Sequence, residues 1–214
     1  MIIAEPDVAL TDYALTIESI LFAWLLYRQA GHKSGIRFWF IVFFCALGLA
    51  AFSGGTSHGF IFDKTSLLYS LAWNGALIAI GMAALSAWMI GAHLIADDKV
   101  TGWLRRAAVT LFVVYCVVVV SVVNTFQVAI LYYLPATLFL FTTYGVHYLR
   151  HRHGHLLSGT VGVLLTFVAA GVQQAGIGLH PVWFDHNAFY HLIQAVALVF
   201  LYFAARGSIS TQEI

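Results

Sequence analysis

Seven apolar stretches, each about as long as a membrane is thick, constrain what this chain can fold into. A helix needs about 20 mostly apolar residues to cross the hydrocarbon core of a bilayer. Short polar breaks separate stretches of that length at residues 10–29, 38–61, 67–95, 104–122, 125–148, 156–178 and 185–206. Only 9% of the residues are charged, against about 25% in soluble domains. We therefore predict an all-α integral membrane protein whose residues 1–214 form a single seven-helix bundle.

The lysines and arginines predict the orientation of this bundle. Nine of the ten lie near the loops after the first, third and fifth spans or after the last span: Arg28, Lys33, Arg37, Lys99, Arg105, Arg106, Arg150, Arg152 and Arg206. Only Lys64 falls on the other side. Because basic residues accumulate on the cytoplasmic side, we predict an outside N-terminus and a cytoplasmic C-terminus.

The predicted location is the plasma membrane, or the inner membrane if the source is bacterial. The net charge of +1 argues against a nucleic-acid partner.

Polar side chains interrupt these spans mainly in their outer halves. The first span carries Asp12 and Glu18, the end of the second carries "SGGTSH", and the seventh begins with "DHNAFYHLIQ". An unpaired polar group in hydrocarbon costs several kcal/mol. The clustering therefore favours a shared polar cavity open to the outer face. The alternative is that these groups only form hydrogen bonds between helices and hold the bundle together.

Three histidines lie at the same predicted depth: His58 near the end of the second span, and His186 and His191 at the start of the seventh. The last two are five residues apart, about 140° around a regular helix. His186 can still turn inward if it lies at the helix entry, where Asp185 would be the N-cap. Three histidines and a water are typical of catalytic zinc sites. We predict a zinc site with His58 and His191 as its firm pair and His186 as third ligand.

Other polar residues would serve this site. Ser57 or Ser53 could hydrogen-bond the water or a developing oxyanion, and Glu18 or Asp63 could act as base. The amide and carboxyl groups expected around these are Asn74, Gln173, Gln174, Asp185, Asn187 and Gln194.

The stretch "DHNAFYHLIQAVALVFLYFAAR" in the last of seven spans, together with the Ser/His stretch of the second, resembles the CREST superfamily. This superfamily includes alkaline ceramidases and the progestin and adipoQ receptors. The resemblance implies a seven-span bundle with zinc held by one histidine of span two and two of span seven. It implies zinc ligands at His58, His191 and either His186 or the Asn187 position. A serine and an aspartate would assist attack of the zinc-bound water on a lipid amide.

The chain departs from the superfamily pattern at three points. Gly54 stands at the position of the usual serine in Ser-x-x-x-His, and the span-seven histidines are spaced His-x-x-x-x-His. The usual aspartate of span three has no counterpart, and Asn74 is the nearest polar residue.

The sequence thus predicts a membrane-embedded, zinc-dependent hydrolase of a lipid amide or ester, with a membrane lipid as substrate or ligand. Two alternatives stay open. One is a receptor or transporter that uses the same cavity, with "SGGTSHG" as a broken helix end, and the other is a haem-binding cytochrome with paired histidine ligands. A retinal protein is excluded because Lys33, Lys64 and Lys99 all lie at loops and none lies within the last span.

Overall fold

The described part of the chain forms seven helices, each long and apolar enough to cross a membrane. The structure is a computed structural model that describes residues 3–29, 34–95, 98–180 and 183–211. The helices are α1 (Pro6–Arg28), α2 (Gly35–Gly59), α3 (Leu67–Ile95), α4 (Asp98–Ser121), α5 (Phe126–His151), α6 (Gly154–Gln174) and α7 (His186–Thr211). The all-helical fold and the seven apolar spans confirm the predicted class. A multi-pass membrane protein follows from them.

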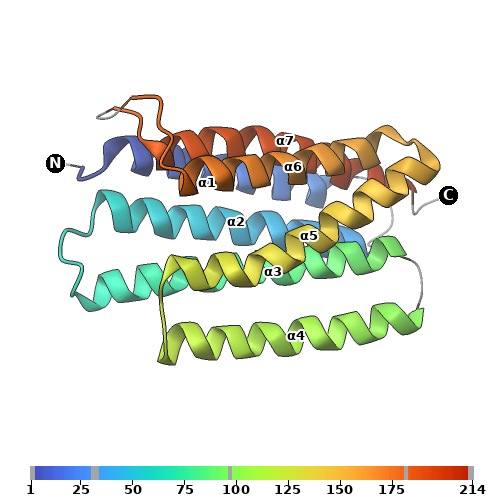
Figure 1. Ribbon diagram of the computed structural model, residues 1–214, viewed down its shortest axis with the longest axis horizontal. Coiled ribbons are helices and arrows are strands. Elements are labelled where there is room, and N and C mark those ends of the chain that lie inside the picture. Colours follow the sequence, from blue (N-terminus) through green and yellow to red (C-terminus); the bar gives the residue numbers. More distant parts are fainter. Residues whose placement is uncertain (1–2, 30–33, 96–97, 181–182, 212–214) are drawn as a thin grey trace.

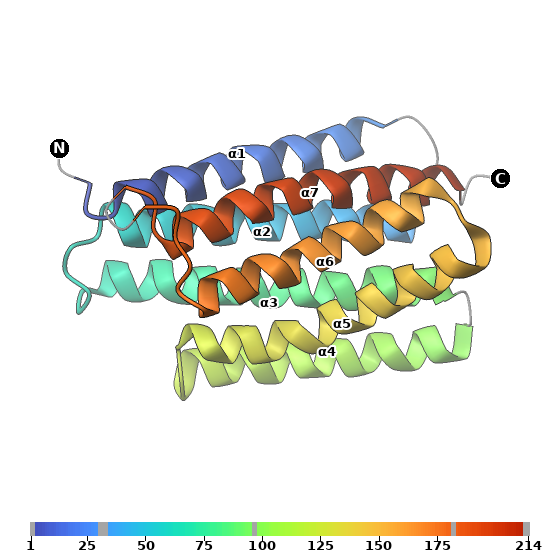
Figure 2. The same cartoon turned by 45° about the horizontal axis from the view of Figure 1, so that its top comes forward.

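Six of the helices form a closed ring. Each packs against the next in the order α1, α2, α3, α5, α6, α7 and back to α1, while α4 lies outside this ring against α3. The helices run along one long axis, and the two termini lie at opposite ends of the bundle (Figures 1 and 2). Because α1 packs against both α2 and α7, it lies between the two helices that carry His58 and His191.

Small residues let α3 pack closely against α2, α4 and α5. Rings from the neighbouring helices lie where a side chain would otherwise stand: Tyr115 of α4 covers Gly81, and Phe139 of α5 covers Gly91. Tyr115 also donates a hydrogen bond of 2.8 Å to the carbonyl of Leu77. In a bilayer, where lipid offers no hydrophobic drive for helix association, such close packing and interhelical hydrogen bonds hold helices together.

The basic residues of the described chain gather at the end of the bundle opposite the N-terminus, apart from Lys64 in the loop after α2. Lys33, which belonged to the predicted basic set, lies outside the described residues. Arg37 has a structural use as well as a charge. Its side chain is buried and donates to the carbonyls of Leu26, Tyr27 and Gln29, which lie at the end of α1, where helical carbonyls run out of backbone partners within the helix.

Candidate functional site

A cavity of about 320 Å³ lies inside the helix ring and is lined by all six ring helices. Its volume falls at the lower end of the range of small-molecule sites. The walls are mostly apolar, with Leu, Ile, Ala and Phe side chains. Polar side chains concentrate at the end nearest the N-terminus, among them Asp12, His58, Gln173, Asn187 and His191. A cavity is therefore present, and its polar side chains are concentrated at one end, with fewer of them deeper in its walls.

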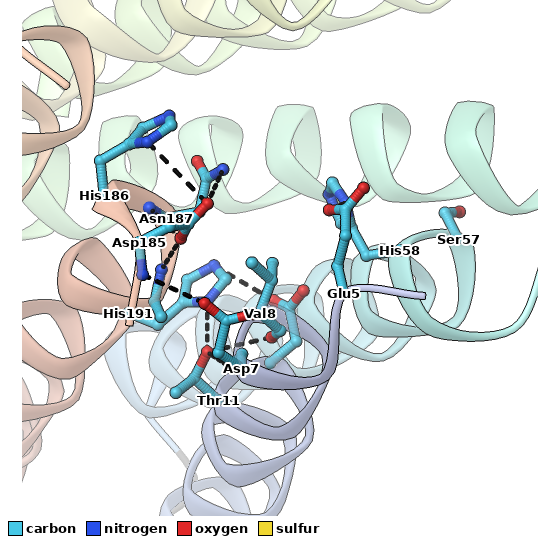
Figure 3. A network of polar contacts seen from close by, with 12 residues as sticks. Glu5, Asp7, Val8, Thr11, Ser57, His58, Asp185, His186, Asn187 and His191 are labelled. Atoms are coloured by element: carbon cyan, nitrogen blue, oxygen red, sulfur yellow. Dashed lines mark hydrogen bonds and ion pairs between the residues drawn. The ribbon is translucent and has the colours of Figure 1, made fainter. Parts of the chain in front are cut away.

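His191 is held between two side chains of α1. Its Nδ1 lies 2.9 Å from Thr11 Oγ1, and its Nε2 lies 3.3 Å from Asp12 Oδ1 (Figure 3). The Asp12 and His191 side chains are only 7% and 10% exposed. Asp12 also closes the space beside Gly54, where a Cβ would stand 3.2 Å from its Oδ2. The carboxylate thus lies against Gly54 of α2.

The contacts of Thr11 favour one tautomer of this imidazole. The Thr11 hydroxyl lies within donating distance of two carbonyls, that of Asp7 at 2.8 Å and that of Val8 at 3.0 Å. When its proton goes to these carbonyls, its oxygen accepts from His191 Nδ1–H, and Nε2 is the nitrogen that shares a proton with Asp12 or presents a lone pair.

His58 is oriented in a similar way by Glu5, the residue just before α1. Its Nδ1 lies 2.6 Å from Glu5 Oε2, and both side chains are partly exposed. Glu5 precedes the first residue of α1, and the neighbouring Ala4 amide donates to the carbonyl of Gly59 at the end of α2. The N-terminal segment is thereby fixed against the helix end that carries His58. Both cavity histidines have Nδ1 engaged, His191 by Thr11 of α1 and His58 by Glu5 just before it, while His58 Nε2 has no hydrogen bond among the described residues.

Asp185 connects the start of α7 to α1. Its Oδ1 accepts from the backbone N–H groups of Asn187 and Ala188 at 2.8 and 2.9 Å, which confirms the predicted N-cap. Its own N–H donates to Asp7 Oδ2 at 3.1 Å. Asn187 in turn accepts from Gln173 Nε2 at 3.0 Å. These contacts fix the position of α7 on α1 and α6 near His191.

The remaining predicted metal ligand, His186, lies apart from the cavity. It begins α7 as predicted, but its side chain is 42% exposed, and its Nδ1 lies 3.9 Å from Asp185 Oδ2. It is not among the residues that line the cavity. Across the described residues, no three His, Cys, Asp or Glu side chains are placed to hold one metal ion together as they stand.

The four predicted catalytic side chains also lie away from the cavity wall. Ser57 donates to the carbonyl of Ser53 at 2.9 Å, as buried helix hydroxyls often do. Glu18 is half-buried on another side of α1. Asp63 lies in the loop after α2, where hydrogen bonds from Thr65 hold the pKa of its carboxyl below its usual value.

Of the surrounding polar groups that the sequence suggested, three line the cavity: Gln173, Asn187 and Gln194. Asn74, Gln174 and Asp185 do not. Conversely, Asp12 was recognised as an acidic residue of the first span but not selected for the site. The spacing of the residues could have indicated Asp12 in part. Val8, Asp12, Leu15 and Ser19 are spaced as on one face of a helix, and all four line the cavity.

A known protein family matches this chain over nearly the whole length of the described fold. A family described as "Family of unknown function (DUF6962)" matches residues 8–210. The chain belongs to this family. No curated protein and no solved structure shows a significant match to it. The family match runs through all seven helices and includes every residue that lines the cavity.

Proposed function

We propose that this member of the DUF6962 family binds an amphiphilic membrane lipid in its ring cavity. The observation that carries the proposal is the division of the cavity, with apolar walls along its length and Asp12, His58 and His191 at one end. A lipid chain would lie along the walls, and its headgroup would meet the polar end. By the distribution of basic residues, that end faces the outside of the cell or the periplasm.

The charges at the polar end select the headgroup. Four carboxyl groups lie there, on Glu5, Asp7, Asp12 and Asp185, and the ion-pair contacts found among the described residues join carboxylates to histidines. An anionic headgroup would meet like charges in a medium of low dielectric constant. The proposed ligand therefore has a headgroup that is not anionic and that donates hydrogen bonds, such as a hydroxyl group.

This proposal can be tested with a long-chain alcohol brominated close to its hydroxyl group. Bromine quenches tryptophan fluorescence on contact, and Trp73 lines the cavity at its polar end, with its ring 6.4 Å from the ring of His58. We expect saturable quenching in lipid nanodiscs, and loss of the saturable part in Trp73→Phe. Dodecanol should compete with the probe, and dodecyl phosphate should not.

A blocking variant separates the cavity from the lipid-facing surface. Ala170→Phe places a ring in the cavity, whereas Val168→Phe places the same ring on the exposed face of the same helix. Binding should be lost in the first variant and retained in the second. Non-saturable quenching alone, or equal binding in both variants, would refute the proposal.

Zinc-dependent hydrolysis of a bound lipid amide or ester is a second candidate, and the orientation of the two histidines favours it. Metal-binding histidines usually donate their other ring N–H to a neighbouring acceptor, as the Nδ1 contacts to Glu5 and Thr11 allow here. The 3.3 Å between Asp12 Oδ1 and His191 Nε2 is close to the roughly 3.4 Å that separates two ligands about 2.1 Å from a tetrahedral zinc. The donor types fit zinc, with His58 completing the set after a side-chain movement.

In this second candidate, Asp12, His58 and His191 would hold the ion, and Glu5 and Thr11 would orient the imidazoles. Bound zinc lowers the pKa of a water to about 7 and so supplies a nucleophile at neutral pH. The apolar walls would hold the acyl chain so that its carbonyl lies at the polar end.

Metal content per chain tests this candidate. We expect about one zinc per chain in gently solubilised protein, with zinc lost in Asp12→Ala, His58→Ala and His191→Ala. His186→Ala is the matched control and should retain the metal, because its side chain lies outside the cavity. Release of fatty acid from a lipid amide or ester would then establish the reaction. Unchanged zinc content in His58→Ala and His191→Ala, or no zinc in the native protein, would rule the candidate out.

A further inference from the structure

A polar side chain deeper in the cavity has an oxygen without a hydrogen-bond partner. Gln194 of α7 lines the cavity and is 6% exposed, and its Oε1 is buried and unpaired among the described residues. Ser19 of α1, at 1% exposure, lines the cavity as well, and its Oγ is likewise unpaired. Buried polar groups are paired in the great majority of proteins. Two unpaired ones in the wall of one cavity therefore point to a ligand.

The neighbours of Gln194 indicate which end of its amide faces Thr166. Gln194 Nε2 lies 3.5 Å from Thr166 Oγ1. The Thr166 hydroxyl donates its only proton to the carbonyl of Gly162 at 3.2 Å. Thr166 can therefore only accept from Gln194, so the amide nitrogen faces Thr166 and the oxygen is left to accept. A ligand group beside Gln194 must then be a donor.

The position of Gln194 on α7 sets where on the ligand this donor lies. Gln194 follows His191 by three residues, which is about 4.5 Å along the helix axis. An extended lipid chain covers that distance in a few bonds. Ser19 follows Asp12 by seven residues, or about 10.5 Å, so it lies too deep to meet the same group.

We propose that the amphiphile bound here carries a second hydrogen-bond donor, a hydroxyl group near the third carbon of its chain, which donates to Gln194 Oε1. This inference rests on the proposed lipid binding and specifies its substrate class. The cavity would recognise a lipid by two polar groups at fixed separation, the first at Asp12 and His191 and the second one helical turn deeper. A plain alkyl chain would leave the oxygen of Gln194 unpaired.

Competition against the brominated alcohol in nanodiscs tests the inference with two matched compounds, 1-dodecanol and 1,3-dodecanediol, compared by their mole fraction in the membrane. We expect the diol to bind roughly tenfold more tightly, as one hydrogen bond to an otherwise unpaired buried acceptor predicts. Gln194→Leu should lose the preference for the diol over dodecanol. Ser19→Ala, the control at greater depth, should keep the preference.

The outcomes separate this inference from the proposed function. Equal affinity of the native protein for both compounds, or a preference that survives Gln194→Leu, overturns the inference and leaves lipid binding in place. Failure of both compounds to compete overturns the proposed function and the inference with it. Because the native protein alone reports the preference, the test does not depend on the folding of any variant.

Discussion

The contact between Asp12 and His191 is the most buried ionisable pair at the polar end of the cavity, and its strength can be measured by a double-mutant cycle. The two side chains are 7% and 10% exposed, and the atoms are 3.3 Å apart. A hydrogen bond to a charged group contributes about 1.5–3 kcal/mol. Interhelical hydrogen bonds within membranes average about 0.6 kcal/mol. The cycle can therefore distinguish a hydrogen bond that involves a charged group from an ordinary neutral hydrogen bond between helices.

We expect Asp12→Ala, His191→Ala and the double variant to lower the free energy of unfolding by similar amounts, because either single change leaves its buried partner unpaired. The coupling energy should be about 1.5–3 kcal/mol. The assay is reversible unfolding in mixed micelles, followed by circular dichroism.

A matched control lies nearby on α1 and α2. Tyr13 OH and Thr56 Oγ1 are 3.0 Å apart and form a neutral hydrogen bond between two helices. The cycle of Tyr13→Phe and Thr56→Val should give about 0.6 kcal/mol. If the Asp12–His191 coupling is no larger than this control, the pair is an ordinary interhelical contact. The reasoning that places shared charge or a proton at the polar end would then be refuted.

Three further predictions concern the scaffold and can be read from the same unfolding assay. Asp185→Ala removes the N-cap of α7 and should cost about 1 kcal/mol; a loss below the error of the assay would contradict the capping role. Gly159→Ala should cost about 1–3 kcal/mol, because the added Cβ would stand 2.5 Å from the buried ring of Tyr144; an unchanged stability would show that this ring can move. Tyr115→Phe removes the hydrogen bond to α3 and should cost about 0.6 kcal/mol, and a cost of several kcal/mol would mean that α4 depends on this single bond.

The sequence by itself determined the class of the protein, the number of spans and the end of the bundle at which polar groups gather. Span length and hydropathy are local properties of the chain, so the predicted stretch 67–95 has the bounds of α3. Other helices differ by several residues at their ends. For example, α1 begins at Pro6, where proline fits the first helical turn, whereas hydropathy placed its start at residue 10.

Only the tertiary structure decided which polar residues face one another. A helix that is apolar on most sides does not reveal which side faces the bundle interior, so the sequence analysis selected Glu18 for the site and not Asp12. They lie six residues apart, about 120° from each other around the helix, and packing turned Asp12 inward. The ring order then placed α1 between α2 and α7, which brought Glu5 to His58 and Thr11 to His191. Such pairings join residues far apart in the chain and depend on how whole helices pack, which no local pattern encodes.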